Sequence, residues 1–192
     1  MGYELELKFA CSADTLSAIA SNVGSFTPVK METTYFDTPD GALSARFITL
    51  RQRLENGNSV CTVKTPAQEN LRGEWEVACS DIVQAIPMLC KLGAPKELLS
   101  LTAPGLTPVC GARFTRLAKT LPLERCSIEL ALDSGILSGG GKELPFFEVE
   151  VEWKGGNQED AILYARQLAA LYGLQVEPRS KFRRALALVK GE

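Results

Sequence analysis

The stretch YELELKF, from Tyr3 to Phe9, decides the fold class of this chain. Successive side chains of a β-strand point to opposite faces. One face of this stretch carries only the charged residues Glu4, Glu6 and Lys8, and the residues between them are apolar. The alternation predicts a strand in a sheet that has one apolar face and one charged face.

The same alternation recurs along the chain and predicts further strands. They are expected at residues 33–36, 47–54, 60–65, 74–78, 107–119, 127–133 and 145–153. Asn56 and Gly57 form a typical hairpin turn. Helices are expected at residues 14–23, 81–92, 95–101, 157–172 and 181–189. Asn157 is a suitable N-cap for the helix that Gly173 follows.

The composition limits the class of protein. A chain of 192 residues that is 45% hydrophobic suits one domain with a substantial core. Its net charge of −2 argues against nucleic acid or an anionic membrane as a partner. No apolar run approaches the ~20 residues of a membrane-spanning helix, and the acidic N-terminus does not resemble an export signal. The six scattered cysteines suit a reduced protein, so we expect a cytoplasmic location.

The chain contains no histidine. Catalysis by a Ser-His or Cys-His pair is therefore excluded, and so is a metal held by histidine. A general base would have to be Glu, Asp, Lys or Tyr. A metal would have to be held by oxygen atoms, which favours Mg²⁺ or Mn²⁺.

Charges of one sign gather on single strands. The charged residues of the segment EVEVE (148–152) are all glutamates, whereas those of LRQR (50–53) are both arginines. A solvent-exposed face explains any one amphipathic strand, but such faces usually mix both signs. Carboxylates side by side repel one another, and a divalent cation relieves that repulsion. Arginines two residues apart suit the oxygens of a phosphate.

Together these patterns predict an α+β fold: a closed antiparallel eight-stranded β-barrel with a polar interior and helices packed outside. Acidic residues would hold a metal on one wall of this tunnel, and basic residues would hold a polyphosphate on the other. The helices would cover the outward apolar side chains, which are Leu5, Leu7, Val149, Val151 and Trp153.

With these motifs in place, the chain resembles the CYTH superfamily, the triphosphate tunnel metalloenzymes. ELELK (4–8) matches the ExExK signature of that family, and further elements follow in order. They are TTYFDTP (33–39), LRQR (50–53), TVK (62–64), GEWE (73–76), FTR (114–116), ELALD (129–133), EVEVE (148–152) and SK (180–181). The resemblance implies a single tunnel domain over residues 1–192, most similar to the bacterial inorganic triphosphatase branch.

The resemblance also implies the ligands of the metal and of the substrate. The divalent cation, Mg²⁺ or Mn²⁺, would be held by Glu4, Glu6, Glu148 and Glu150. Asp133 matches an acid that binds a second metal or orients the basic residues. The triphosphate would be bound by Lys8, Arg51, Arg53, Lys64, Arg116 and Lys181.

Four nearby charged residues have a surface explanation that is as good or better. Glu152 lies near the end of its strand, where a solvated surface is equally expected. Arg113 is three residues from Arg116 and faces outward if Arg116 faces inward. Arg183 and Arg184 suit a solvated helix face.

Phosphoryl transfer requires mainly alignment and charge neutralisation. The attacking water would lose its proton to a carboxylate such as Glu6, or to a Tyr35–Lys64 pair that matches one proposed in hydrolytic relatives. Both alternatives stay open at this stage.

We expect hydrolysis of inorganic triphosphate to diphosphate and phosphate. The alternatives within the family are a class IV adenylate cyclase and a thiamine or nucleoside triphosphatase, because the tunnel motifs are common to all of them. A non-catalytic polyphosphate-binding module is the alternative from another class. The expected partner is a small triphosphate, and a homodimer is left open.

Overall fold

The computed structural model describes residues 2–3, 5–66 and 73–191. Within these ranges the strands form one ten-stranded sheet in the order β1-β6-β5-β4-β3-β7-β8-β9-β2-β10, and neighbouring strands are antiparallel. The strands are β1 (Gly2–Tyr3), β2 (Glu6–Ala10), β3 (Thr27–Asp37), β4 (Thr49–Glu55), β5 (Asn58–Lys64), β6 (Gly73–Ala78), β7 (Thr107–Pro122), β8 (Cys126–Gly139), β9 (Lys142–Gly156) and β10 (Gln175–Val176).

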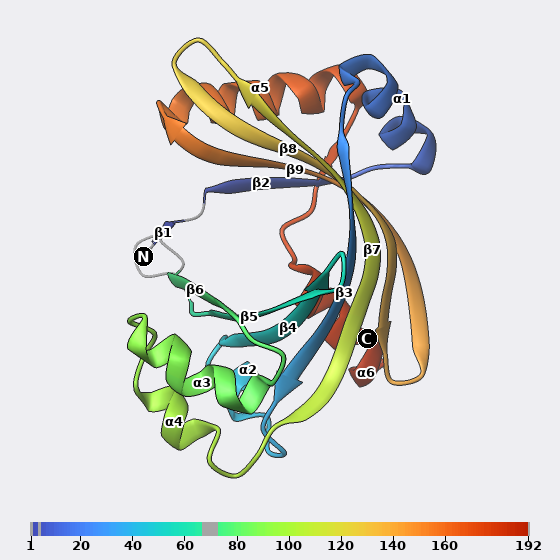
Figure 1. The fold of residues 1–192 in the computed structure, drawn as a ribbon. Coiled ribbons are helices and arrows are strands. Elements are labelled where there is room, and N and C mark those ends of the chain that lie inside the picture. The colour runs from blue at the N-terminus through green and yellow to red at the C-terminus, as the bar shows by residue number, and fades with distance from the viewer. Residues whose placement is uncertain (1, 4, 67–72, 192) are drawn as a thin grey trace.

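The helices form two outer groups and one inner element. They are α1 (Ala13–Val23), α2 (Ala42–Ala45), α3 (Ile82–Lys91), α4 (Glu97–Leu101), α5 (Gln158–Tyr172) and α6 (Lys181–Lys190). Figure 1 shows α1 and α5 over one end of the curled sheet and α2, α3 and α4 beside the other end. None of the helices in the described part of the chain is long and apolar enough to span a membrane.

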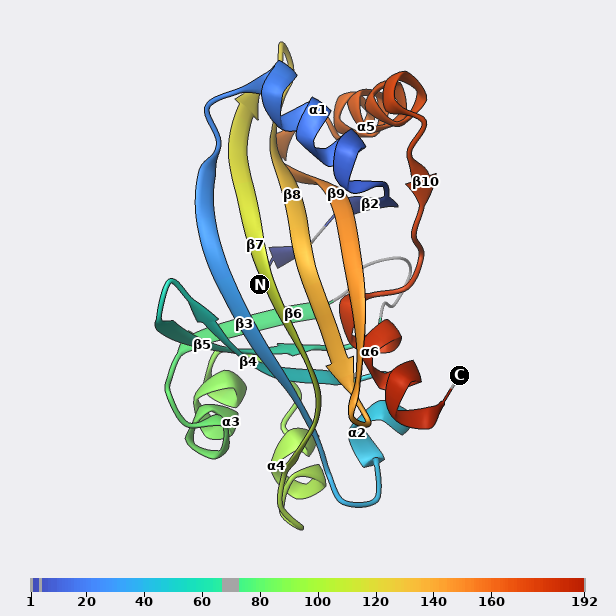
Figure 2. The same ribbon diagram turned by 90° about the vertical axis from the view of Figure 1, so that its right-hand side faces the viewer.

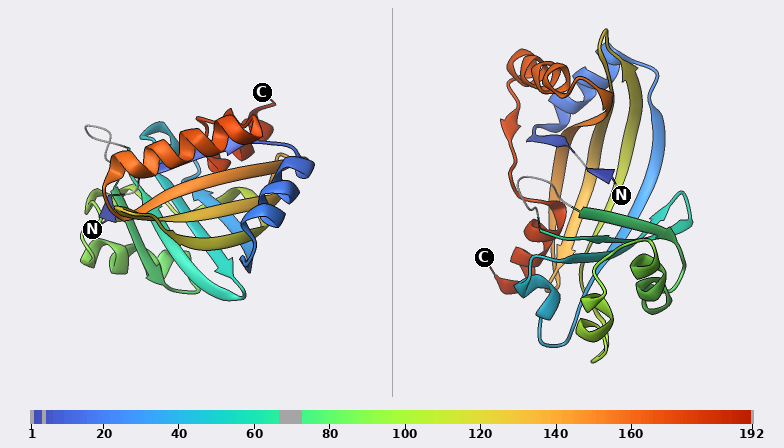
Figure 3. Two further views of the ribbon diagram at one scale, coloured as in Figure 1. Left: turned by 90° about the horizontal axis from the view of Figure 1, so that it is seen from above. Right: turned by 90° about the vertical axis from the view of Figure 1, so that its left-hand side faces the viewer.

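Long, twisted strands curl the sheet around a central space. Figure 2 shows β3, β7, β8 and β9 running side by side along the molecule, with β4, β5 and β6 crossing below them. The N-terminal segment contacts both ends of the strand order, since Gly2 in β1 pairs with Glu74 and Lys8 in β2 pairs with Glu150. Figure 3 shows the same curl from two further sides.

The expected closed eight-stranded barrel is not found in this form. The antiparallel sheet and its outer helices are present, but the described residues form ten strands in an open order from β1 to β10. One reason is that the N-terminal segment forms two short strands, which pair with opposite ends of the order.

Alternation places the apolar side chains on the outer face, where helices cover them. Val149 and Val151 of β9 are fully buried in a core that includes Leu16 and Ile19 of α1 and Ala165 of α5. Leu7 and Trp153 pack at its edge. A second core joins β4, β5 and β6 to α3. The prediction that helices cover the outward apolar side chains is therefore confirmed for Leu7, Val149, Val151 and Trp153, whereas Leu5 is half-buried and does not belong to this core.

Helix α6 differs from the expectation that all helices pack outside. Its side chains Phe182 and Ala185 pack with Tyr35 of β3, and with Phe114 and Phe146 of the long strands. Because Phe114 lies two residues from Arg116 on the same strand face, α6 lies against the charged inner face. The end of the chain therefore contributes to the interior of the curl.

Local signals were accurate at turns and helix ends. Asn56 and Gly57 join β4 to β5 with φ of 49° and 88°, as a tight hairpin turn of this type requires. The side chain of Asn157 caps α5 by accepting a hydrogen bond from the Glu159 amide, and Gly173 ends the helix in the left-handed conformation.

Candidate active site

A cavity of about 740 Å³ lies within the curl and is lined mainly by charged side chains. The sequence-predicted residues that line it are Glu6, Lys8, Tyr35, Arg51, Arg53, Lys64, Arg116, Glu150 and Lys181. Asp133 and Glu148 are fully buried beside Glu150. Glu4, the remaining predicted metal ligand, lies outside the described residues.

Strands β4 and β5 build the basic wall. Because side chains alternate along a strand, Arg51 and Arg53 both face the cavity, and each side chain is about nine-tenths buried. Burial, together with the like charge of Arg51, lowers the pKa of Arg53 below its ordinary value. Within the described part of the chain, the guanidinium of Arg53 has two long hydrogen bonds, at 3.4 Å to the Thr33 hydroxyl and 3.3 Å to Glu55.

Glu74 of β6 forms ion pairs with Arg51 of β4 and Lys64 of β5, and so keeps these two cations side by side. Its carboxylate lies 3.6 Å from Nη2 of Arg51 and 3.0 Å from Nζ of Lys64. Nε of Arg51 is buried and has no hydrogen-bond acceptor among the described residues. A buried donor without an acceptor is costly, so this wall is suited to bind a further anion.

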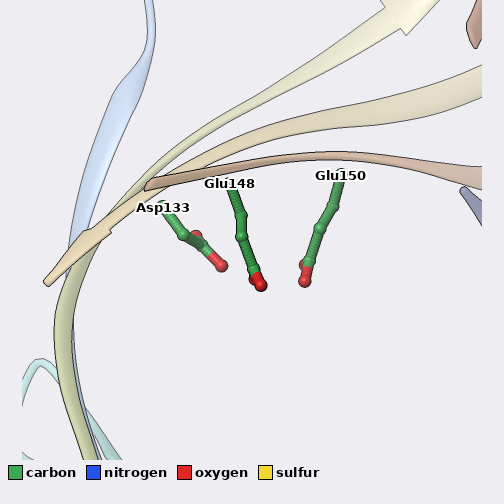
Figure 4. A group of neighbouring side chains, drawn as sticks. All are labelled: Asp133, Glu148 and Glu150. Atoms are coloured by element: carbon green, nitrogen blue, oxygen red, sulfur yellow. The ribbon is translucent and has the colours of Figure 1, made fainter. Parts of the chain in front are cut away.

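Three carboxylates from β8 and β9 build the opposite wall. Asp133 pairs in register with Glu148, and Glu150 is the next inward residue of β9. Oxygen atoms of the three groups lie within 4.8 Å of one another. Figure 4 shows the three side chains extending in the same direction from neighbouring strands.

Three cationic side chains neutralise this acidic cluster. Arg116 donates to both oxygens of Asp133, at 2.8 and 2.7 Å, and also to Glu150. Lys181 lies 2.8 Å from Asp133 and 2.7 Å from Glu150, and it contacts Glu148 as well. Arg184 contacts the other oxygen of Glu148. The repulsion expected from the sequence is thus relieved by the chain's own cations, two of which come from the distant α6.

The cluster shifts the pKa values of its members. Burial alone would raise the pKa of Glu150 and lower that of Lys181. Their mutual attraction, with Arg116 also acting on Glu150, outweighs burial, so the pKa of Glu150 lies below its usual range and that of Lys181 above it. At Glu148 burial dominates and raises the pKa despite the attraction of Lys181. The charge of Glu148 is therefore less well compensated than that of Glu150.

These residues fit a hard divalent cation by their donor chemistry. Glu6, Glu148 and Glu150 supply only oxygen atoms, which Mg²⁺ and Mn²⁺ prefer. Oε2 of Glu148 is buried and contacts Lys181 without forming a hydrogen bond. Glu6 lines the cavity on β2, next to the strand that carries Glu150.

Tyr35 and Lys64 lie on strands separated by β4. Tyr35 of β3 pairs in register with Arg51 of β4, and Arg51 pairs with Thr62 of β5. Lys64 lies two residues after Thr62 on the same strand. The Tyr35 ring packs 5.1 Å from the ring of Phe182 in α6, and the residue is 3% exposed. The ammonium of Lys64 is directed to Glu74.

Of the four residues for which the sequence offered a surface explanation, two lie on the surface and two contribute to the site. Arg113 is exposed and forms a surface ion pair with Glu143, as expected from its spacing. Arg183 is exposed as well. Glu152 lines the cavity and pairs with Lys154 at 2.8 Å.

The interpretation of Arg184 as a solvated residue was wrong, because it is 7% exposed and contacts Glu148. A sequence signal for this role exists in the spacing of Lys181, Arg184 and Ala185. Residues three and four apart share one face of a helix, and all three are buried. The neighbouring Arg183 falls on the other face.

The chain is similar to known proteins over most of its length. The CYTH domain matches residues 2–186 of the chain. The inorganic triphosphatase of Haemophilus influenzae is 27% identical over 192 residues, which cover 96% of this chain and 54% of that protein. The chain therefore spans about half the length of this curated relative.

Solved structures share the fold at low sequence identity. A Hippeastrum protein, described as a candidate adenylyl cyclase with a dominant triphosphatase activity, has a TM-score of 0.70 and 18% identity. That match covers 97% of this chain and 96% of the other. A candidate adenylate cyclase from Bacillus halodurans has a TM-score of 0.68 and 21% identity, and covers 95% of this chain and 96% of its own.

Proposed function

This chain belongs to the CYTH domain family, and from this premise we propose that it hydrolyses inorganic triphosphate to diphosphate and phosphate with a divalent cation. The observation that carries the proposal is the cavity, in which Arg51, Arg53 and Lys64 face an acidic wall that includes Glu6 and Glu150. The curated relative named as an inorganic triphosphatase supports the same reaction.

In this proposal the basic wall binds the phosphate chain. Arg51, Arg53, Lys64 and Lys8 donate to its oxygen atoms, and charge-assisted hydrogen bonds from guanidinium groups also orient it. Burial lowers the pKa of Lys8 despite the attraction of nearby carboxylates, so a bound anion would stabilise the charged form of this ammonium. The N-terminal segment, which pairs with both β6 and β9, lies beside both walls that bind the substrate in this proposal.

The acidic wall holds Mg²⁺ or Mn²⁺ through Glu6, Glu148 and Glu150, with Glu4 as a further ligand. When bound, the cation supplies charge neutralisation at the terminal phosphate. Arg116 keeps Asp133 and Glu150 in place by donating hydrogen bonds to both carboxylates.

Glu6 accepts the proton of the attacking water in this scheme. It lies on the wall that carries Glu150 and is exposed to the cavity. Tyr35, by contrast, is buried against Phe182. The Tyr35–Lys64 pair is the alternative base.

The cavity lining favours an inorganic substrate over an organic triphosphate. Among the described lining residues the aromatic side chains are Phe9, Tyr35 and Phe182. Phe9 belongs to the outer core, and Tyr35 and Phe182 pack on each other. A nucleobase or a thiamine ring would need an accessible aromatic or apolar surface.

A substrate panel tests this function. Inorganic triphosphate, ATP, GTP and thiamine triphosphate are compared by phosphate release, with a separate readout for cyclic nucleotides. We expect the highest kcat/KM for inorganic triphosphate. Formation of cyclic AMP as the main product would make the chain a cyclase, and binding of triphosphate without turnover would make it a binding module.

A further inference from the structure

The ammonium of Lys181 contacts all three carboxylates of the acidic wall. An ammonium group has three donors; Lys181 donates one hydrogen bond to Glu150 and forms ion pairs with Asp133 and Glu148. The same carboxylates are bound by Arg116 and Arg184, so that both oxygens of each one contact a cationic side chain. A divalent cation that binds these oxygens therefore competes with the three side chains and is repelled by their positive charges.

Of the three cations, Lys181 is the one that can leave. Arg116 lies directly opposite Asp133 on the neighbouring strand and binds it with two parallel hydrogen bonds. Arg184 is buried, lies outside the cavity lining and is also near Glu177. Lys181 lines the cavity at the first residue of α6, on a flexible stem.

The aromatic residues behind the cluster do not depend on Lys181. Its ammonium lies 5.3 Å from the ring centre of Phe114 and 5.4 Å from that of Phe146. Arg116 also covers Phe114, and Arg184 covers Phe146. Both rings thus keep a cation contact if Lys181 moves.

We propose that Lys181 is an exchangeable counter-cation: it binds the three carboxylates until a divalent cation takes its place, and it then donates to the triphosphate. This inference rests on the proposed function. Its consequence is that metal and triphosphate bind cooperatively, because the same movement opens the carboxylates and supplies a new donor to the anion. Lys181 is then a positioning residue for the metal and a ligand of the substrate.

Binding of Mn²⁺ alone, measured by calorimetry, tests this exchange without any turnover. Lys181→Met removes the competing ammonium and should bind Mn²⁺ about tenfold more tightly than the parent, because charge-assisted hydrogen bonds no longer have to be broken. Lys8→Met is the matched control. The charge of Lys8 acts on Glu6, Glu148 and Glu150, but Lys8 forms no ion pair with the described residues. Its loss should tighten Mn²⁺ binding much less.

Equal tightening in both variants, or none in Lys181→Met, would overturn the exchange. The hydrolysis proposal would survive that result, because phosphate release by the parent protein tests it separately. A second measurement follows the ε-ammonium signal of Lys181 in the folded parent protein labelled with ¹⁵N-lysine. The signal is assigned by its loss in Lys181→Arg. Mg²⁺ with a bis-methylene triphosphate should shift this signal, and an unchanged signal would also overturn the proposal.

Discussion

Arg116 of β7 binds Asp133 of β8 by donating two parallel hydrogen bonds of 2.8 and 2.7 Å. The carboxylate is fully buried, and the guanidinium is largely buried. The antiparallel register brings the two residues directly opposite each other, next to Glu148 of β9. The pair therefore fixes the position of Asp133, beside which the other carboxylates of the acidic wall lie.

Replacing Asp133 with Asn should destabilise the protein by about 3–5 kcal/mol, because it leaves Arg116 and Lys181 with less buried negative charge than they need. Urea unfolding followed by circular dichroism measures this change. Glu143→Gln, which breaks the exposed pair with Arg113, is the control and should leave the unfolding free energy nearly unchanged. Equal stability of Asp133→Asn and the parent would show that the cluster does not stabilise the fold.

Arg51→Ala and Arg53→Ala should each weaken the binding of triphosphate by about 1.5–3 kcal/mol, the contribution of a hydrogen bond to a charged group. Calorimetry in the presence of EDTA measures the affinity without turnover. Arg183→Ala, on the exposed face of α6, is the matched control and should bind as the parent does. If all three variants bind equally, the basic wall is not the phosphate site.

Glu6→Gln should lower kcat by about 100-fold or more, since it removes a proposed metal ligand and proton acceptor. Tyr35→Phe should keep kcat within a few-fold of the parent. Steady-state kinetics at saturating Mg²⁺ measures both variants, and their thermal unfolding checks that they are folded. The opposite ranking would make the Tyr35–Lys64 pair the base.

The cysteines offer a test of the fold that is independent of catalysis. All six are free, and burial raises the pKa of both Cys61 and Cys110 to about 12. At pH 8 only about one in ten thousand of these groups is a reactive thiolate. Mass spectrometry should show that iodoacetamide leaves both unmodified in the folded protein and labels both in urea. Rapid labelling without urea would contradict their placement in the core.

Much of the basic wall could be predicted from the sequence, because local rules control it. Alternation along one strand is sufficient to place Arg51 and Arg53 on the same face, and a hairpin turn brings Lys64 alongside. The inward placement of Glu148 and Glu150 follows from the same rule.

The tertiary position of α6 could not be predicted from local rules. Its helical pattern was evident, but the position of Lys181 and Arg184 against Glu148 depends on contacts between residues more than thirty positions apart. The sequence also did not reveal that β3 and β8 extend well beyond their alternating segments. Their length depends on pairing with neighbouring strands, which patterns within one strand do not report.

The central claim is that this cavity hydrolyses inorganic triphosphate with a divalent cation. The most direct test follows inorganic triphosphate by ³¹P NMR with the protein in EDTA, and then with excess Mg²⁺. The account predicts no change in EDTA and, after Mg²⁺ is added, conversion to equal amounts of diphosphate and phosphate that Glu6→Gln does not produce. Triphosphate that stays intact with both Mg²⁺ and Mn²⁺, or that is cleaved equally well in EDTA, would contradict it.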